Sequence, residues 1–261
     1  MDHQRQVEFA HAFRGLHQPG APLIIYNAWD AGSAQAIARA GAKAIATGSD
    51  SVAAAQGYPD GEQIPFDFVL RIAGRIAASV DLPVSIDIEG GYAEDPRDIK
   101  MHTEQLLDIG VVGLNFEDGH PKEEGAGLHG LDVQASRIAA IRGGADARSV
   151  PLFINARCDL FLQAEDTASH PSLLQEAIAR ARAYANAGAD GFFVPLLTDL
   201  TLIEQLADAV PLPINVMAIP GGPTAKAFAG AGASRISHGP FPYRETLEGL
   251  ERRATEVLAS M

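Results

Sequence analysis

The sequence predicts an α/β protein of the (β/α)8, or TIM-type, barrel class, formed as a single domain over residues 1–261. Three observations carry this prediction. A strand-and-helix unit recurs along the chain, its strands follow either a Gly or a Pro, and the length suits eight such units. Eight parallel strands alternating with helices over about 250 residues are typical of a sheet that closes into a barrel.

Two alternating sets of segments mark the strands. Four begin with Pro and run into an apolar strand, in residues 21–28, 81–89, 149–157 and 211–217; four others contain a Gly before a small-residue strand, in residues 38–48, 107–118, 185–195 and 229–239. In the second set, the position where a helix end needs a left-handed residue is taken by Gly41, Gly110, Gly188 and Gly232. In the first set, Pro opens the strand, where a missing N–H costs least.

Helical spacing of apolar residues fills the gaps, as in residues 67–80 and 172–188. A first helix, over about residues 3–16, has Val7, Phe13 and Leu16 on one stripe and is predicted to cap the barrel floor. The alternative fold is an open doubly wound sheet, which usually shows a Gly-rich turn after its first strand. The stretch YNAWDAGS lacks such a turn, so the barrel is favoured.

Composition limits the partners. The formal net charge is −13, whereas nucleic acid and anionic membranes both require a basic surface, so neither is expected as a partner. The N-terminal stretch MDHQRQVEFAHAF lacks the layout of a signal peptide, and no apolar run approaches the roughly 18 residues of a membrane span. With a single cysteine no internal disulfide can form. We therefore expect a soluble, cytoplasmic protein.

Alternation within the strands predicts which side chains point into the barrel. With Asp87 inward, the same parity selects Ser85, Asp87, Glu89, Asn115, Glu117, Asn155, Arg157, Phe193, Pro195, Asn215, Met217, Ser237 and Gly239. These residues become more polar toward the carboxyl ends of the strands, where barrel enzymes place their chemistry. Asp60, in the loop AAAQGYPDGEQ, is expected to fold over the same mouth.

The predicted cluster of carboxylates requires compensation. Two carboxylates about 4 Å apart repel by roughly 4 kcal/mol at an effective dielectric constant of 20. Proton sharing, Arg157 or a divalent cation could offset this repulsion. Because neither His nor Cys joins the cluster, its ligands are oxygens, which suit Mg²⁺ or Mn²⁺. The alternative is a buried ion-pair network of Arg157 with two carboxylates.

Five motifs, in order between about residues 20 and 240, carry a resemblance to a known family: YNAWDAGSA, ATGSDSVAAAQGYPDG, SIDIEGGY, GLNFEDG and INARCDLFL. Together they resemble the isocitrate lyase/phosphoenolpyruvate mutase superfamily. The resemblance implies a modified barrel that binds Mg²⁺ and cleaves or forms C–C or P–C bonds next to a 2-oxo or 2-hydroxy carboxylate. It also implies a homodimer or homotetramer, often with a late helix exchanged, for which the C-terminal stretch RETLEGLERRATEVLAS is available.

The resemblance also implies roles for individual residues. Asp87 would hold the metal directly, and Asp60, Glu89 and Glu117 would hold it directly or through water. The substrate carboxylate or enolate oxygen would contact Arg157 and the backbone N–H groups of Thr47, Gly48 and Ser49, and we add the inward Asn215 as a candidate for substrate binding.

One loop departs from the family pattern. The lyases carry Lys-Lys/Arg-Cys-Gly-His after the fourth strand, and its cysteine acts as acid or base. Here the loop reads EDGHPKEEGAGLHG, without the cysteine and without the Asn of the mutases. His120 and Lys122 are the candidates for moving a proton, which completes a predicted catalytic set with Arg157 and Glu117. The alternative is a solvated loop without a chemical role.

The predicted function is a Mg²⁺-dependent lyase that cleaves a C–C bond of a small 2-oxo or 2-hydroxy carboxylate through an enolate. A phosphonopyruvate-type mutase or hydrolase acting on a P–C bond and a non-catalytic metabolite-binding barrel remain alternatives. A glycoside hydrolase is disfavoured because only 7% of residues are aromatic. A Schiff-base aldolase is excluded because none of the lysines falls at an inward strand end.

Overall fold

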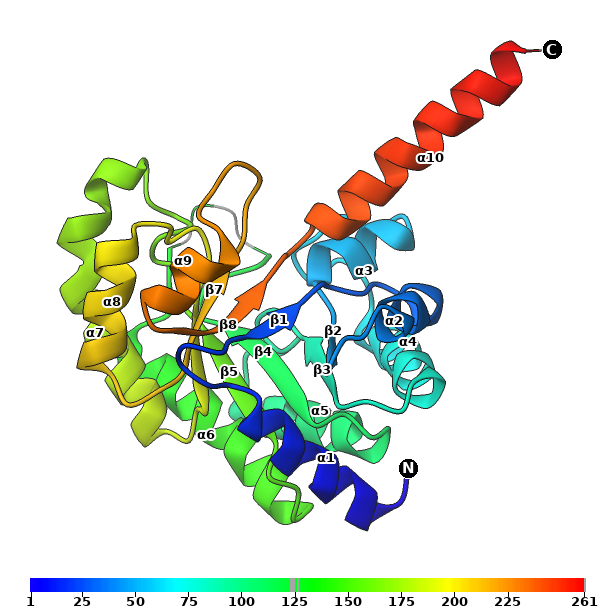
Figure 1. The fold of residues 1–261 in the computed structure, drawn as a ribbon. Helices are drawn as coiled ribbons and strands as arrows, with labels where there is room; N and C mark the ends of the chain where they lie inside the picture. Colours follow the sequence, from blue (N-terminus) through cyan, green and yellow to red (C-terminus); the bar gives the residue numbers. More distant parts are fainter. Residues whose placement is uncertain (123–124, 126, 261) are drawn as a thin grey trace.

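The computed structural model describes residues 1–122, 125 and 127–260, and its centre is a ring of parallel strands (Figure 1). These are β1 Leu23–Ile25, β2 Ile45–Ala46, β3 Val84–Asp87, β4 Gly113–Glu117, β5 Phe153–Arg157, β6 Gly191–Val194, β7 Ile214–Met217 and β8 Ala233–Ser237. Around the sheet their order is β1-β8-β7-β6-β5-β4-β3-β2. The first strand therefore pairs with the last, which confirms the barrel and rules out the open doubly wound sheet.

The ring is nearly closed. Between β1 and β2 a single parallel bridge joins Ala28 to Thr47, and the N–H of Ala28 donates to the carbonyl of Ala46 at 2.8 Å. The other neighbours share longer ladders, which set the residues around the mouth side by side. Asp87 pairs with Asn115 between β3 and β4, and Glu117 pairs with Arg157 between β4 and β5.

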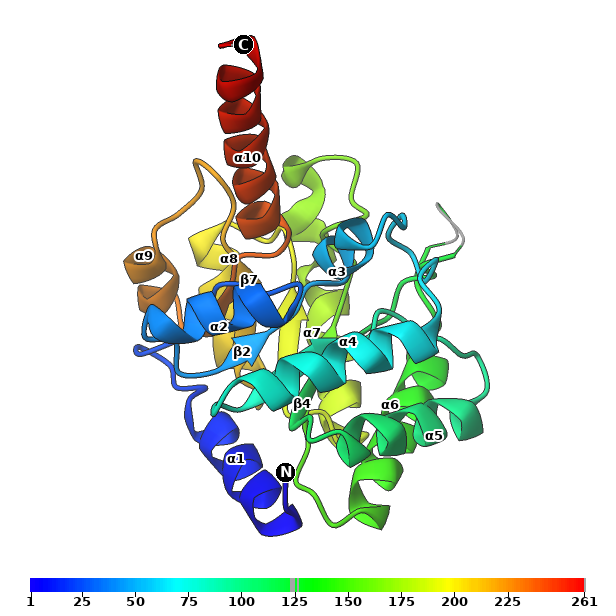
Figure 2. The same cartoon turned by 90° about the vertical axis from the view of Figure 1, so that its right-hand side faces the viewer.

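Helices surround the strands (Figure 2). They are α1 His3–Gly15, α2 Ala31–Arg39, α3 Ser49–Ala55, α4 Phe66–Ser79, α5 Pro96–Asp108, α6 Leu131–Ala147, the 3-10 turn η1 Thr167–Ser169, α7 His170–Asn186, α8 Leu200–Ala209, α9 Ala225–Gly230 and α10 Phe241–Ala259. In the described part of the chain, no helix combines the length and apolar character needed to span a membrane.

Local sequence explains where these helices begin and end. At the start of α5 the Asp95 side chain accepts a hydrogen bond from the N–H of Arg97, and Pro96 takes the first helical position, where no N–H is needed. The glycines predicted to end helices are left-handed, with φ of +97°, +91°, +103° and +91° at Gly41, Gly110, Gly188 and Gly232. Each lets the chain turn directly into the next strand.

Helix α1 closes the amino-terminal end of the barrel, as predicted. Its Phe13 is fully buried and packs edge-on against Phe153 of β5, with ring centroids 5.5 Å apart. The space is tight, because a Cβ added at Gly113 would lie 2.7 Å from Phe13. The side chain of Gln6 ties the helix to the loop before β4 through the carbonyls of Leu107 and Val111. The ligand-accessible end of the barrel is therefore the opposite, carboxyl end.

Helix α10 does not fold back over the barrel but projects away from it, as both views show (Figures 1 and 2). Its first turn is anchored, because Tyr243 packs edge-on against Trp29. The remainder exposes apolar side chains, Leu247, Leu250, Val257 and Leu258. The outer face of β1 is correspondingly uncovered: Ile24 and Tyr26 are 43% and 44% exposed and line a groove of about 470 Å³ against α2.

Candidate active site

A pocket of about 180 Å³ opens at the carboxyl ends of the strands. It is lined by Asn27, Gly48, Ser49, Asp50, Asp60, Asp87, Asn115, Arg157, Leu162, Phe193, Pro195, Met217, Ser237, Gly239 and Pro240. Sites for drug-sized ligands usually measure about 300–1,000 Å³. The pocket is therefore suited to a small metabolite.

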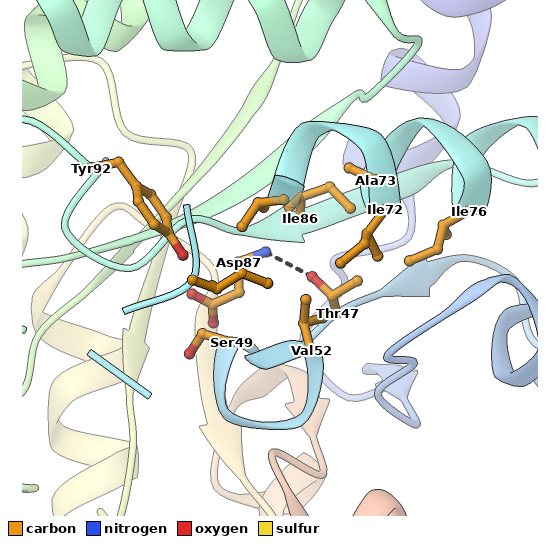
Figure 3. Close-up of a pocket in the computed structure, with 11 residues that line it drawn as sticks. Thr47, Ser49, Val52, Ile72, Ala73, Ile76, Ile86, Asp87 and Tyr92 are labelled. Atoms are coloured by element: carbon orange, nitrogen blue, oxygen red, sulfur yellow. Dashed lines mark hydrogen bonds between the residues drawn. The ribbon is translucent and has the colours of Figure 1, made fainter. Parts of the chain in front are cut away.

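Asp87 lies at the end of β3 and faces this pocket. Its N–H donates to Thr47 Oγ1 at 2.9 Å (Figure 3). Its carboxylate accepts from Asn115 Nδ2 at 3.1 Å and from the N–H of Glu89 at 3.1 Å. A second cavity of about 10 Å³, roughly the space of one water, lies between Asp87, Ser49 and α4. Asp87 is therefore fixed by neighbouring strands while one side of its carboxylate stays open to a ligand.

Glu89 is held differently from Asp87, although it lies only two residues further on. Strand β3 ends at Asp87, and Glu89 takes a left-handed backbone with φ of +50°. Its carboxylate accepts from the N–H groups of Gly61 and Glu62, both at 2.8 Å, and from the Tyr92 hydroxyl at 2.9 Å. Regular strand alternation therefore ends before Glu89, and Glu89 is not among the residues that line the pocket. Its carboxylate still lies in the acidic cluster, because the charges of Asp60 and Asp87 both raise its pKa.

The environment of Glu89 favours its neutral form. Burial, followed by the charge of Asp60, raises its pKa to about 7, against the hydrogen bond from Tyr92. Because Glu89 anchors the turn at Gly61 and Glu62, it also positions the neighbouring Asp60. Glu89 is therefore a buried support for the loop that carries Asp60.

Arg157 forms the ion-pair network that the sequence left open as an alternative. Its Nη1 lies 2.7 Å from Glu117 Oε2, and its Nε and Nη2 donate to the two oxygens of Asp159 at 2.5 and 2.9 Å. Burial opposes the charge of Arg157, but Asp159 and Glu117 raise its pKa. Burial also raises the pKa of Glu117, against the attraction of Arg157. One arginine thus compensates carboxylates at the ends of two neighbouring strands.

Asp60 completes the pocket from the loop between α3 and α4. Partial burial, and then the charge of Asp87, raise the pKa of Asp60, while a hydrogen bond with Ser49 opposes the rise. Neither Asp60 nor Asp87 forms an ion pair with a lysine or arginine of the described chain. Two carboxylates of like charge thus face one small pocket.

These donors suit a hydrated Mg²⁺. Mg²⁺ is commonly held by one or two carboxylates while it keeps several waters, and Asp60 and Asp87 provide such a pair. No three Asp, Glu, His or Cys side chains of the described residues are arranged as a complete metal cage. The direct or water-mediated ligation predicted for Glu89 and Glu117 stays a prediction, because each carboxylate is occupied by protein donors.

Four other predicted residues lie around the pocket rather than in its wall. His120 packs on the His129 ring at 3.8 Å between centroids, and Lys122 pairs with Glu62 at 3.0 Å. In the same loop, residues 123, 124 and 126 lie outside the described residues. Asn215 is buried below the pocket, with its amide bonded to the carbonyl of Val216. The fourth, Thr47, lines the small second cavity beside Asp87.

The backbone N–H groups proposed to bind substrate divide into two kinds. Thr47 donates its N–H to the carbonyl of Ser85 at 3.1 Å, so this group is already used in the sheet. Gly48 and Ser49 line the pocket, and neither N–H has a backbone acceptor in the described chain. Only the latter two are free to meet a ligand.

Arg235 is a buried residue of the site that the sequence analysis missed. It lies inside the barrel on β8, where its Nη2 approaches Asn115 Oδ1 at 3.4 Å and its Nε approaches Ser237 Oγ at 3.3 Å. Burial lowers its pKa to about 10, against the charge of Asp87. Arg235 lies two residues before Ser237 in β8, so both side chains point to the same side of the strand. Applying the alternation to the earlier residues of β8 would have predicted that Arg235 points into the barrel.

A parallel barrel with carboxylates and an arginine at its carboxyl end is the architecture of many barrel enzymes. Comparison with known proteins narrows the class. The model of the phosphoenolpyruvate phosphomutase family matches residues 13–258. The chain belongs to this family, within the phosphoenolpyruvate mutase/isocitrate lyase superfamily.

Individual relatives agree. An uncharacterized protein of Mycobacterium tuberculosis (strain H37Rv) is 34% identical, over 94% of this chain and 88% of its own. The 2-methylisocitrate lyase of Escherichia coli (strain K12) is 30% identical over a stretch that covers 78% of this chain and 67% of the lyase. A Burkholderia cenocepacia J2315 protein, provisionally named a phosphonomutase, is 45% identical in sequence. Its crystal structure superposes with a TM-score of 0.93 and covers 96% of this chain and 99% of its own.

A more distant structure shares the fold. Phosphonopyruvate hydrolase, solved with oxalate and Mg²⁺, has a TM-score of 0.83 at 19% identity, over 96% of this chain and 87% of its own. The superfamily contains Mg²⁺-dependent C–C lyases, mutases and hydrolases that act on small carboxylates.

Proposed function

We propose that this protein is a Mg²⁺-dependent lyase that cleaves a C–C bond of a small 2-oxo or 2-hydroxy carboxylate through an enolate. One observation carries the proposal: Asp60 and Asp87 face the same small pocket, form no ion pair with a lysine or arginine of the described residues, and share the pocket wall with Arg157. This arrangement suits a cation and an anionic substrate bound side by side.

Different residues of the pocket are proposed to bind the metal and the substrate. Asp87 and Asp60 would hold Mg²⁺, which when bound supplies Lewis-acid polarisation of the substrate oxygen. The N–H groups of Gly48 and Ser49 and the guanidinium of Arg157 bind the carboxylate and stabilise the charge that develops on the enolate. Because the chain fixes these donors before substrate arrives, little reorganisation is needed during the reaction.

The proton step is assigned to the loop after β4, through His120 or Lys122. Both side chains point elsewhere in this structure, so the assignment requires one of them to turn toward the pocket. The E. coli relative named 2-methylisocitrate lyase supports C–C cleavage, whereas the B. cenocepacia relative named for phosphonomutase supports P–C chemistry as the second candidate.

Calorimetry tests the proposed site. Oxalate, which mimics the enolate of pyruvate, is titrated into the protein with and without Mg²⁺. We expect binding only with Mg²⁺, lost in Asp87→Ala and kept in the control Asp67→Ala, whose carboxylate is on the surface. Binding that ignores both the metal and Asp87 would refute the site. Release of pyruvate or glyoxylate from a panel of 2-hydroxy and 2-oxo acids then separates an enzyme from a binding protein.

We also propose a homodimer or homotetramer in which α10 packs on another copy of the chain. The apolar residues exposed on α10 and the uncovered groove at Ile24 and Tyr26 support this. Light scattering should show an oligomer that Leu250→Glu dissociates and that the neighbouring control Glu251→Gln leaves intact. A monomeric wild-type protein would contradict the proposal.

A further inference from the structure

Arg235 is a buried cation that has no acidic partner among the described residues. Its side chain is 0% exposed, and none of the described carboxylates forms an ion pair with its guanidinium. Its Nη1 also lacks a hydrogen-bond partner in the described chain. Toward the barrel floor, the Phe13 ring lies 6.0 Å from its Cζ, at the outer limit of a cation–π contact. Burying a charge without a paired partner is costly, so stability alone does not explain this arginine.

Two hydrogen bonds in series connect Arg235 to Asp87. Arg235 Nη2 donates to Asn115 Oδ1 at 3.4 Å, and Asn115 Nδ2 donates to Asp87 Oδ2 at 3.1 Å. The charge of Asp87 also raises the pKa of Arg235 against the effect of burial. Arg235 itself is not among the residues that line the pocket. It therefore acts on the site from below, without touching a ligand bound there.

The charge of Arg235 matters more to the site than its hydrogen bond does. Asn115 Oδ1 also accepts from Asn155 Nδ2 at 2.9 Å, which is shorter than the bond from Arg235, so the Asn115 amide stays oriented without the arginine. The charge acts over a longer range. Because the interior around it is floored by the buried rings of Phe13 and Phe153, this charge is screened less than it would be in water.

This charge enters the balance of charges around the pocket. Arg157 is already paired with two carboxylates, whereas Asp60 and Asp87 have no ion pair with a lysine or arginine of the described residues. Arg235 therefore offsets the charge of Asp87 before any ligand is bound. A cation that binds at Asp87 is repelled by Arg235, and an anion that binds after the cation is attracted by it.

We propose that Arg235 is a positioning residue that acts through Asp87: its buried charge weakens the binding of the metal alone and strengthens the binding of the anionic substrate to the metal-loaded site. This inference rests on the proposed function, because it assumes that Asp87 holds Mg²⁺. The site then retains the metal best when the substrate is bound with it.

Two binding measurements on Arg235→Met test the inference. Free Mn²⁺, which replaces Mg²⁺ as a paramagnetic probe, is counted by electron paramagnetic resonance, and oxalate is titrated by calorimetry into protein saturated with Mn²⁺. Relative to wild type, we expect Mn²⁺ to bind about tenfold more tightly and oxalate to bind about threefold more weakly. A purely structural disturbance would weaken both, so the opposite signs identify an effect of charge. Any other combination of the two changes would overturn the inference.

Further variants serve as controls. Arg235→Gln is neutral but polar and should repeat both changes, and it replaces Arg235→Met if urea unfolding shows that the methionine variant does not fold. Arg142→Met removes an arginine that pairs with Asp190 just before β6, at the amino-terminal end of the barrel, and should change neither affinity. If wild type does not bind Mn²⁺, or if Asp87→Ala binds it equally well, the proposed function fails and this inference fails with it. If wild type binds Mn²⁺ through Asp87 but Arg235→Met leaves both affinities unchanged, only the role of Arg235 fails.

Discussion

Glu89→Gln tests whether the buried carboxyl group destabilises the protein when it ionises. Glu89 is only 2% exposed, and its pKa is raised to about 7 by burial and by Asp60. Below the pKa of 4.5 for an exposed glutamate, the group is protonated in both folded and unfolded chains. As pH rises toward 7, the unfolded chain releases its proton first, so stability falls through this window.

The size of the effect follows from the same shift. At about 1.4 kcal/mol per pKa unit, moving the pKa from 4.5 to about 7 costs about 3 kcal/mol once Glu89 is charged. Glutamine has the same shape and cannot ionise. Its oxygen can still accept from Gly61 and Glu62, while its NH₂ group can donate to Tyr92. Any change in stability that the substitution causes for other reasons is the same at every pH, so it does not affect the pH dependence.

Urea unfolding in metal-free buffer between pH 4.5 and 8 measures this difference. The stability of Glu89→Gln relative to wild type should rise by about 3 kcal/mol across the range, with most of the change below pH 7. Tyr92→Phe, which removes a donor to the Glu89 carboxylate, should extend the wild-type slope to higher pH. A relative stability that stays flat with pH would refute the raised pKa.

Three further substitutions probe the frame of the barrel, each read by urea unfolding. Gly113→Ala should destabilise by about 1–3 kcal/mol, because the new methyl would lie 2.7 Å from Phe13; an unchanged midpoint would contradict the tight packing of α1. Burial lowers the His17 pKa to about 3, so between pH 6.5 and 3 the unfolded chain binds a proton at His17 that the folded chain does not, and stability falls. His17→Phe should reduce this loss of stability, and an unchanged pH dependence over this range would contradict the lowered pKa. Asp118→Ala should cost about 3–5 kcal/mol, because it removes one of the two carboxylates paired with Arg180 and the buried acceptor of the Tyr184 hydroxyl and the Asp159 N–H; a loss under about 1 kcal/mol would show this buried cluster to be dispensable.

The fold was predictable because its signals are local. Left-handed glycines at helix ends and prolines at strand starts act within a few residues, so they mark the repeating unit directly. Alternation also placed Asp87, Asn115, Arg157 and Met217 correctly, since all four line the pocket. Regular backbone geometry transmits these positions from sequence to structure.

The site was less predictable where the regular backbone stops. Glu89 lies beyond the end of β3, and its left-handed backbone breaks the alternation that the prediction extended to it. The sequence predicted four acidic residues at the mouth, Asp60, Asp87, Glu89 and Glu117, and only tertiary packing shows that Arg157 pairs with Glu117 and with Asp159. The direction of Lys122 is likewise set by Glu62, which is 60 positions away in the chain but adjacent in space.

The one bridge between β1 and β2 makes this joint the weakest in the ring, and it adjoins Gly48 at the pocket. Where few backbone hydrogen bonds hold two segments, local opening requires little free energy. The barrel should therefore open locally between β1 and β2, and amide hydrogen exchange at Ala28 should be faster than within β4 and β5. A ligand bound to the N–H of Gly48 would stabilise the closed contact between β1 and β2. Slower amide hydrogen exchange at Ala28 would then show that the pocket is occupied, without an activity assay.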